Sequence, residues 1–278
     1  MEQTRRDSPS TENQMIEFRA LGALEIRTDI RVCTPTAPRV RQILALLLMR
    51  ANQVVPLDLI IEELWDDSPP KTAVTTVQTY IYRLRTNILR KTMGTAGHAM
   101  LPTMAQGYLL RVEHGALDTE VFRRLVTRGR VHLEQGRHDE AAHDLRDALA
   151  MWSGPPLANV RLGPLLQTHV ALLEEDRLRA RELRISADLM LGRHRELIGE
   201  LRSLVAAHPL NEWLHGQLIT ALGRAGRRSE ALQAYQNLRI ILKRELGLEP
   251  SAEAERLQAE VLRAAGHAGR TDVPLSIR

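Results

Sequence analysis

The stretch KTAVTTVQTYIYRLRTNILRK, residues 71–91, decides the fold of the first half of this chain. Its apolar residues recur at spacings of three and four, which predicts a single amphipathic helix. The buried stripe of that helix is expected to hold Val74, Val77, Ile81, Leu84 and Ile88. The opposite face carries hydroxyl and guanidinium groups and no acid: Thr72, Thr75, Thr76, Thr79, Tyr82, Arg83, Thr86 and Arg90.

Such a face suits a helix in the major groove of DNA, because hydroxyls can bond base edges or phosphates while Arg and Lys neutralise backbone charge. The ordinary alternative is a solvated helix, although threonine is a mediocre helix former. The surrounding charge favours DNA. From 71 to 112 there are six basic residues and no acidic one, namely Lys71, Arg83, Arg85, Arg90, Lys91 and Arg111. A local basic surface of this kind is typical of nucleic-acid binders.

Length and composition set the outer limits. A chain of 278 residues with 44% hydrophobic content predicts a globular protein of two domains. The longest apolar run, residues 43–49, is too short to span a membrane, so no membrane partner is expected. The polar start has no apolar segment behind it, so we expect residues 1–14 to be a disordered tail and the protein to be cytoplasmic, near the nucleoid. A single cysteine, Cys33, rules out an internal disulfide.

The segments around the helix predict an α+β winged helix-turn-helix. Short strands are expected at 16–21 and 24–26, a third through Ile30 and Val32, helices at 38–52 and 57–65, and a hairpin of strands 100–103 and 108–112. In this fold the third helix enters the major groove and the hairpin, or wing, touches the neighbouring backbone.

Two further charged groups flank the expected recognition helix. Arg39 and Arg41 stand at the start of the helix at 38, where cations are unfavourable for the helix dipole but could meet a phosphate. Five carboxylates lie on the outer side of the helix at 57–65 and in the loop after it: Asp58, Glu62, Glu63, Asp66 and Asp67. Because carboxylates cannot favour DNA contact, we interpret them as facing a protein partner.

The second half of the chain contains internal repeats. Gly136, Gly192 and Gly226 each begin a helical segment, and the last two are 34 residues apart, the tetratricopeptide period. The first interval is one period plus a 22-residue insertion. At fixed offsets from these glycines stand the expected core residues Ala141, Leu145, Ala148, Leu197, Leu201, Leu204, Ala231, Tyr235 and Leu238. Stacked helical hairpins of this kind leave a concave surface free for a partner.

These residues together resemble a known family. The runs FRALGALEIR, PRVRQILALLLMRANQVVPLDLIIEELWDDSPPKTAVTTVQTYIYRLRTNI and QGYLL resemble the OmpR-type winged helix of the Streptomyces antibiotic regulatory proteins. The runs WSGPPLANV and ALQAYQNLRIILKRELGLEPS resemble the bacterial transcriptional activator domain that follows it in that family. The expected division is therefore a winged helix at 15–112, an activator domain at 117–266 and a tail at 267–278. One departure is Leu109, where members often have a basic residue after the Gly-Tyr pair of the wing.

The resemblance implies a transcription activator that binds direct repeats near the −35 region as a head-to-tail dimer. It would recruit RNA polymerase holoenzyme, through the sigma factor and core subunits, to a secondary-metabolite (antibiotic) gene cluster. We expect Thr72, Thr75, Thr76, Thr79 and Arg83 to read bases. The expected phosphate contacts are Arg85, Arg90, Lys91, Arg39 and Arg41, and Lys71, Tyr82 and Gln106 complete the expected interface.

Other classes of protein are less well supported. No phosphate loop, dinucleotide fingerprint, metalloprotease motif, serine elbow or spaced Cys/His set is present, so neither an enzyme nor a cofactor is expected. A helical-repeat adaptor would fit the second half but does not need the acid-free basic stretch. A DNA-binding repressor stays open, because a fold does not decide what happens to transcription.

Overall fold

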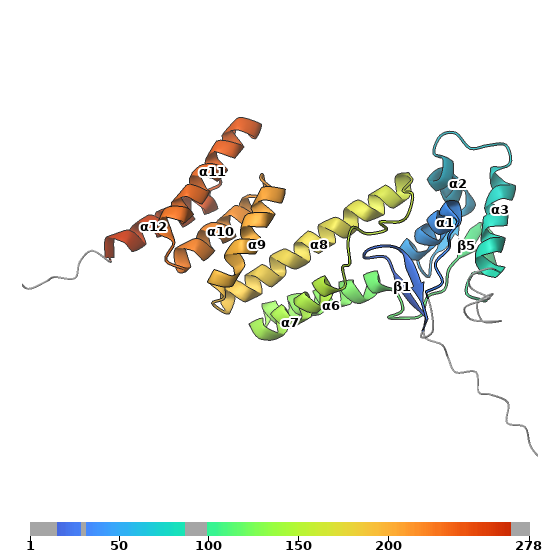
Figure 1. Cartoon of the computed structure of the whole chain (residues 1–278), viewed down its shortest axis with the longest axis horizontal. Helices are drawn as coiled ribbons and strands as arrows, with labels where there is room; N and C mark the ends of the chain where they lie inside the picture. Colours follow the sequence, from blue (N-terminus) through green and yellow to red (C-terminus); the bar gives the residue numbers. More distant parts are fainter. Residues whose placement is uncertain (1–15, 29–31, 87–98, 268–278) are drawn as a thin grey trace, which may run out of the picture. The chain divides into compact units, whose positions relative to one another are not determined.

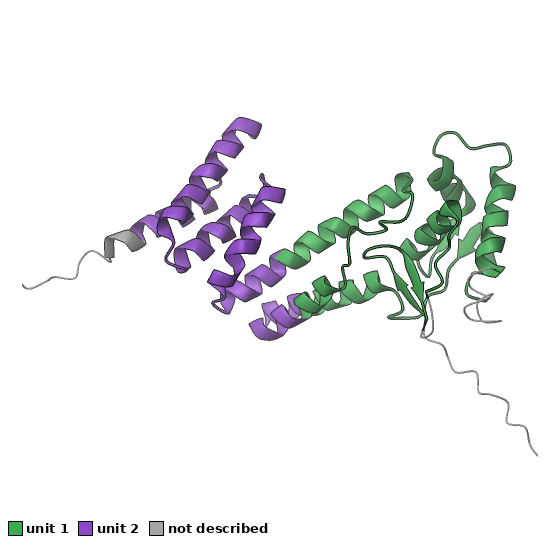
Figure 2. Ribbon diagram, in the orientation of Figure 1, with its two compact units in different colours: residues 1–128, 144–181 green, residues 129–143, 182–278 purple. Residues whose placement is uncertain are grey.

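The computed structural model describes residues 16–28, 32–86 and 99–267. The chain divides into two compact units (Figure 2): unit 1 comprises residues 1–128 and 144–181, and unit 2 comprises 129–143 and 182–278. The expected tails at both ends lie outside the described residues, apart from the first position of the C-terminal one. Ile30, Ile88, Arg90 and Lys91 also lie outside them.

Unit 1 begins with a two-stranded antiparallel sheet. β1 (Glu17–Arg19) pairs with β2 (Glu25–Arg27), with Phe18 opposite Ile26. Both of these side chains are fully buried, as expected when alternate residues of a strand face the core. The expected third strand is represented by an isolated bridge between Arg27 and Val32.

Three helices follow, and they gather around one core (Figure 1). α1 (Pro38–Met49) starts at a proline, and its apolar residues are almost all buried. α2 (Leu57–Trp65) has the bounds that the sequence predicts. α3 (Ala73–Leu84) begins two residues later than the expected helix, because residues 71 and 72 form a turn before it, and the expected part from residue 87 lies outside the described residues.

The buried stripe of α3 differs from the prediction at its first position. Val77, Ile81 and Leu84 are buried as expected, but Val74 is 44% exposed. Ala73 takes the buried place instead, at 5% exposure. The helix begins at Ala73, and the spacing of four residues between Ala73, Val77 and Ile81 turns the smaller side chain inward.

The wing is a three-stranded sheet in the order β3-β5-β4. β5 (Gly107–Leu109) lies between β4 (Thr103–Met104) and β3 (Val54–Pro56), a strand that the sequence did not predict. Gly107 is required there, because a Cβ at this position would lie 2.0 Å from the carbonyl oxygen of Val55. The helices and this hairpin confirm the winged helix.

The N-terminal sheet is held by residues that the sequence assigned to the second domain. Both the Ala20 and Leu21 amides donate to Oδ2 of Asp118, at 2.8 and 2.9 Å. The side chain of Asn159 accepts from the Leu24 amide at 2.7 Å and donates to its carbonyl at 3.2 Å. Unit 1 therefore crosses the boundary that was expected between 112 and 117.

Three helices run from one unit into the other along the chain: α6 (Asp118–Glu134), α7 (His138–Ala150) and α8 (Pro164–Met190). Unit 2 continues with α9 (His194–Ala207), α10 (Glu212–Arg224), α11 (Arg228–Leu246) and α12 (Ala252–His267). α9 to α12 share one apolar core.

The repeat glycines have the same conformation in all three places. Gly136, Gly192 and Gly226 have φ of 73°, 76° and 79°, the left-handed region that favours glycine. In each case the next residue donates its amide to the carbonyl five positions back, at 2.9 to 3.0 Å, which is the Schellman end of a helix. All nine expected core residues of the repeats are buried. The predicted helical repeats are therefore confirmed.

Within the described part of the chain, no helix is long and apolar enough to cross a bilayer.

Candidate nucleic-acid interface

The outer face of α3 and the turn before it present a continuous polar surface. Lys71, Thr75, Gln78 and Tyr82 follow one another at spacings of four, three and four, and all four are exposed. Beside them lie Thr72, Val74, Thr79 and Arg83, which are also exposed, and the half-buried Thr76. Tyr82 is 66% exposed. This face, residues 71–83, contains no acidic side chain and is called the α3 face below.

The start of α3 adds positive potential to this face. Thr72 is the N-cap residue, but its side chain makes no capping hydrogen bond, and the first turn contains no acid. The amide of Ala73 donates to the carbonyl of Pro70 at 2.9 Å. The two amides that follow, those of Val74 and Thr75, direct the positive potential of the helix start toward an outside acceptor. A phosphate oxygen is the kind of group that such a helix start binds.

Two threonines of the α3 face, Thr76 and Thr79, already use their hydroxyl protons. The hydroxyl of Thr76 donates to the carbonyl of Thr72 at 2.8 Å, and that of Thr79 donates to the carbonyl of Thr75 at 2.9 Å. In this rotamer each hydroxyl oxygen is free to accept. Thr76 and Thr79 are therefore set up to accept from the amino group of a base, such as N6 of adenine or N4 of cytosine.

Arg85 does not belong to this surface, contrary to the expectation that it holds a phosphate. Its Nε donates to the carbonyl of Leu101 at 2.8 Å, and its Nη2 donates to the hydroxyl of Thr103 at 2.9 Å. The guanidinium carbon lies 5.7 Å from the ring centre of Tyr108. Burial lowers the pKa of Arg85 from its usual value. Arg85 thus holds the wing against α3.

Arg39 and Arg41 are likewise held by groups of the same unit. Arg39 donates to the carbonyl of Leu64 and, at 3.1 Å, to Oε1 of Gln42. Arg41 donates to three carbonyls, those of Pro35, Thr36 and Asn159, the last at 2.6 Å. These acceptors occupy the guanidinium groups, so we leave both arginines out of the interface.

Of the five carboxylates expected on the outer side of α2 and in the loop after it, one is buried. The sequence placed Glu63 on the outer side, but it is 2% exposed. Its carboxylate accepts from the amides of Gly163 and Leu166, at 2.7 and 3.0 Å, and from Nε2 of Gln42. The expectation for Glu63 is wrong, because these three donors satisfy a carboxylate inside the unit. The others of the group, Asp58, Glu62, Asp66 and Asp67, are exposed.

The sequence prediction missed two residues of the α3 face. Gln78 is exposed between Thr75 and Tyr82, and a glutamine amide can bond an adenine edge in a bidentate manner. The spacing of three from Thr75 is the signal that could have found it. Val74 was assigned to the core, and its exposed methyl groups can instead contact the methyl group of a thymine.

At the tip of the wing, Ala105 and Gln106 form the tight turn between β4 and β5. The Gln106 carbonyl accepts from the Leu57 amide at 3.1 Å, while the residue is exposed. Leu109, the departure noted in the wing, is half-buried in β5. The tip therefore offers Gln106 for contact but no basic side chain among the described residues.

Two family descriptions match the chain in order. "Transcriptional regulatory protein, C terminal" matches residues 33–110, and "Bacterial transcriptional activator domain" matches residues 117–262. The first match contains the α3 face and the wing, and the second contains the helical repeats.

Regulators of actinobacteria are similar over nearly the whole chain. Regulatory protein DnrI of Streptomyces peucetius is 40% identical over 252 residues, which cover 90% of this chain and 93% of that protein. Transcriptional regulator RedD of Streptomyces coelicolor is 32% identical, over 89% of this chain and 70% of that protein. The solved structure of Mycobacterium tuberculosis EmbR in complex with low affinity phosphopeptide has a TM-score of 0.85 and 30% identity, over 91% of this chain and 66% of that chain.

Proposed function

This chain belongs to the Streptomyces antibiotic regulatory protein family of transcriptional activators, and we propose that it binds direct repeats in promoter DNA through the α3 face. The promoters would be those of a secondary-metabolite gene cluster, with the repeats overlapping the −35 region. The observation that carries this proposal is the acid-free, exposed row of Lys71, Thr75, Gln78 and Tyr82 on the third helix of a winged helix and the turn before it.

The side chains of the α3 face divide by their chemistry. Thr75, Thr76, Gln78, Thr79 and Arg83 reach base edges, because they present hydrogen-bonding groups from the exposed side of α3. Lys71, Thr72 and the amides of Val74 and Thr75 at the start of α3 hold a phosphate, with Tyr82 packing beside the backbone. Gln106 touches the backbone from the wing, and Arg90 and Lys91 remain proposed phosphate contacts outside the described residues.

Two protomers bind head to tail on the direct repeat. Winged helices that read one half-site each must lie on the same side of the duplex, so half-sites about 10 to 11 bp apart are expected. At this spacing the two protomers lie next to each other on the DNA, so the dimer forms when they bind it.

The exposed carboxylates Asp58, Glu62, Asp66 and Asp67, on α2 and the loop after it, form the surface that meets RNA polymerase. They lie on the same winged helix as the α3 face but have the opposite charge, so DNA would repel them and a basic protein surface would attract them.

A selection from random DNA with the purified chain tests the DNA half of this proposal. We expect the selected sequences to contain one motif twice, in the same orientation, with centres about 10 to 11 bp apart. Inverted copies of the motif, or no enriched motif, would contradict the proposal.

A transcription assay on the selected DNA tests the polymerase half. The charge reversals Asp66→Lys and Asp67→Lys together should abolish activated transcription and preserve DNA binding. Glu196→Lys, an exposed acid on α9, is the control and should leave transcription unchanged. Full transcription by the double variant would show that these carboxylates do not meet RNA polymerase. Repression by the unaltered chain would overturn the activator role.

A further inference from the structure

Unit 2 contains a cavity of about 310 Å³ between α10 and α12. Its apolar lining comes from Ile219 on α10 and from Leu257 and Val261 on α12. Ile219 and Val261 are almost fully buried in the core that α9 to α12 share, and the half-buried Leu257 packs against that core. A floor of this kind favours the apolar part of a molecule over water.

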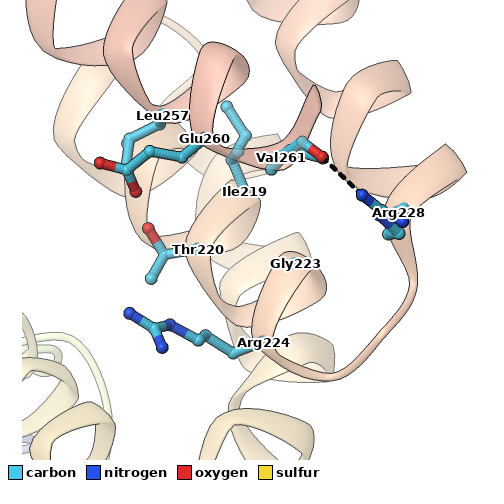
Figure 3. Close-up of a pocket in the computed structure, with 8 residues that line it drawn as sticks. All are labelled: Ile219, Thr220, Gly223, Arg224, Arg228, Leu257, Glu260 and Val261. Carbon is cyan, nitrogen blue, oxygen red and sulfur yellow. Dashed lines mark hydrogen bonds between the residues drawn. The ribbon is translucent and has the colours of Figure 1, made fainter. Parts of the chain in front are cut away.

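The two helices on either side of this floor are held in place. The guanidinium group of Arg228, at the start of α11, donates to the carbonyl of Val261 at 3.1 Å (Figure 3). On α10, Gly223 lets α12 approach closely, because a Cβ at this position would lie 3.3 Å from Cγ2 of Val261. The cavity is therefore bounded by helices that already contact each other.

Three polar side chains of the cavity stand in a row. Figure 3 shows the carboxylate of Glu260, the hydroxyl of Thr220 and the guanidinium of Arg224 on the same side of the cavity, in that order. Within the described part of the chain, none of these three side chains makes a hydrogen bond or an ion pair. Glu260 and Arg224 thus line one cavity with opposite charges that do not neutralise each other.

The hydroxyl of Thr220 differs from those of other helical threonines. Thr127 and Thr168 donate to the carbonyl four positions back, at 2.8 and 3.1 Å. Thr220 and Gly216 both lie in the described helix α10, yet no such bond joins them. In Figure 3 the hydroxyl oxygen of Thr220 is on the side of Glu260. This oxygen can accept from a cationic group that binds Glu260.

The neighbouring cavity between α9, α10 and α11, of about 360 Å³, lacks such an arrangement among its described lining residues. Its Arg202 and Glu230 bond to each other, and Gln233 bonds to Asn237 at 3.0 Å. A ligand gains less from polar groups of this kind, because it must replace bonds that already exist.

The two opposite charges select the kind of ligand. An ion of one sign is attracted by one of them and repelled by the other. A molecule that carries both charges is attracted by each. Thr220 and Arg224 also line a cavity of about 490 Å³ beside α8, but Glu260 does not, so a ligand that contacts both charges lies between α10 and α12.

We propose that the cavity between α10 and α12 binds an amino acid with an apolar side chain. Arg224 binds the carboxylate, Glu260 binds the ammonium group, and Thr220 accepts a hydrogen bond from the ammonium group. The apolar side chain packs on Ile219 and Leu257. This inference does not rest on the proposed DNA binding.

Three probes with the same phenyl group test the two charges. They are L-phenylalanine, 2-phenylethylamine, which lacks the carboxylate, and 3-phenylpropanoate, which lacks the ammonium group. Each is titrated at pH 7 into the full chain without DNA, and the methyl resonance of Ile219 reports binding. We expect L-phenylalanine to bind roughly fivefold more tightly than each analogue, the effect of one exposed ion pair.

Two variants identify which side chain binds which charge. Arg224→Gln should abolish the preference for L-phenylalanine over 2-phenylethylamine and keep the preference over 3-phenylpropanoate. Glu260→Gln should do the reverse. Arg195→Gln and Glu196→Gln, at exposed residues of α9 outside the cavity, are the matched controls and should keep both preferences.

The proposal is overturned by equal affinity of the unaltered chain for the three probes, by binding of none of them, or by preferences that Arg224→Gln and Glu260→Gln leave unchanged. Failure of this titration would leave the DNA selection unaffected, so the two proposals are tested separately.

Discussion

Gln78 and Arg83 lie on the exposed side of α3, whereas Arg85 turns into the unit, and these positions decide what each side chain can do. The helical period predicts the exposed set, because residues three and four apart share a face. The inward arginines and Glu63 could not be predicted in this way. Arg41 reaches an acceptor 118 positions away and Glu63 a donor 100 positions away, so only the tertiary fold brings the partners together.

Gln78→Ala should lower the affinity for the selected operator by about 1 to 3 kcal/mol and relax the preference at one base pair. The reason is that the amide is exposed at the centre of the α3 face and can bond an adenine edge. Fluorescence anisotropy with operators changed at each base pair measures this. Gln236→Ala, an exposed glutamine on α11, is the matched control and should change nothing. Equal losses on every operator would show that Gln78 does not read a base.

Arg83→Ala should lower DNA affinity, and Arg85→Ala should lower the stability of the fold. The first removes an exposed guanidinium, so DNA affinity should fall while the free energy of unfolding stays the same. The second removes two hydrogen bonds to the wing, so unfolding should become easier by about 1 to 3 kcal/mol. Urea unfolding and DNA titration of both variants separate the roles. An Arg85→Ala protein that is as stable as the unaltered chain but has lost DNA binding would show that Arg85 contacts DNA.

Among the elements, the helices are more predictable than the strands. α2 and the start of α1 follow from apolar spacing and from prolines. β3 has only three residues, and its pairing with β5 joins positions 54–56 to 107–109, which no local pattern reveals. The repeat glycines were found because a left-handed helix end needs the same residue each time.

Gly107→Ala should lower the free energy of unfolding by at least about 1 to 3 kcal/mol, because the new methyl group would overlap the carbonyl of Val55. DNA affinity should fall with it. Gly154→Ala is the matched control, because a Cβ there meets nothing within 4 Å. Thermal unfolding of both variants gives the answer, and a Gly107→Ala protein as stable as the control would mean that the strands are not paired as described.

On the scale of the whole molecule, the compact units do not follow the order of the two matched families. The sheet at the start of the chain bonds to Asp118 and Asn159, which lie in the activator domain match. Sequence patterns locate each family match, but they cannot show that residues near 20 and near 118 share hydrogen bonds. Unit 1 is therefore more than the winged helix.

Asp118 gives unit 1 a measurable pH dependence. Burial raises the pKa of its carboxyl from 3.8 to about 6. A folded pKa above the unfolded one means that the folded unit holds the proton more tightly. The stabilisation from this group is full below about pH 3.8 and is lost as the pH rises through about 6, a change of roughly 3 kcal/mol.

Asp118→Asn should remove this dependence, because the amide keeps an acceptor for Ala20 and Leu21 but cannot ionise. Urea unfolding between pH 4 and pH 7, followed by the fluorescence of Trp65 and Trp152 in a Trp213→Phe background, measures it. The unaltered chain should lose stability relative to the variant as the pH rises. A constant difference across this range would show that Asp118 stays ionised.

The central claim is that the α3 face binds a direct repeat, and a salt titration of DNA binding tests it most directly. The probes are the selected direct repeat and a version with one half-site scrambled, from 50 to about 200 mM salt. We predict much tighter binding to the intact repeat, and an affinity for it that falls steeply and linearly on a logarithmic scale, because phosphate contacts release counterions. Equal affinity for the two probes, or affinity that does not change with salt, would contradict the account.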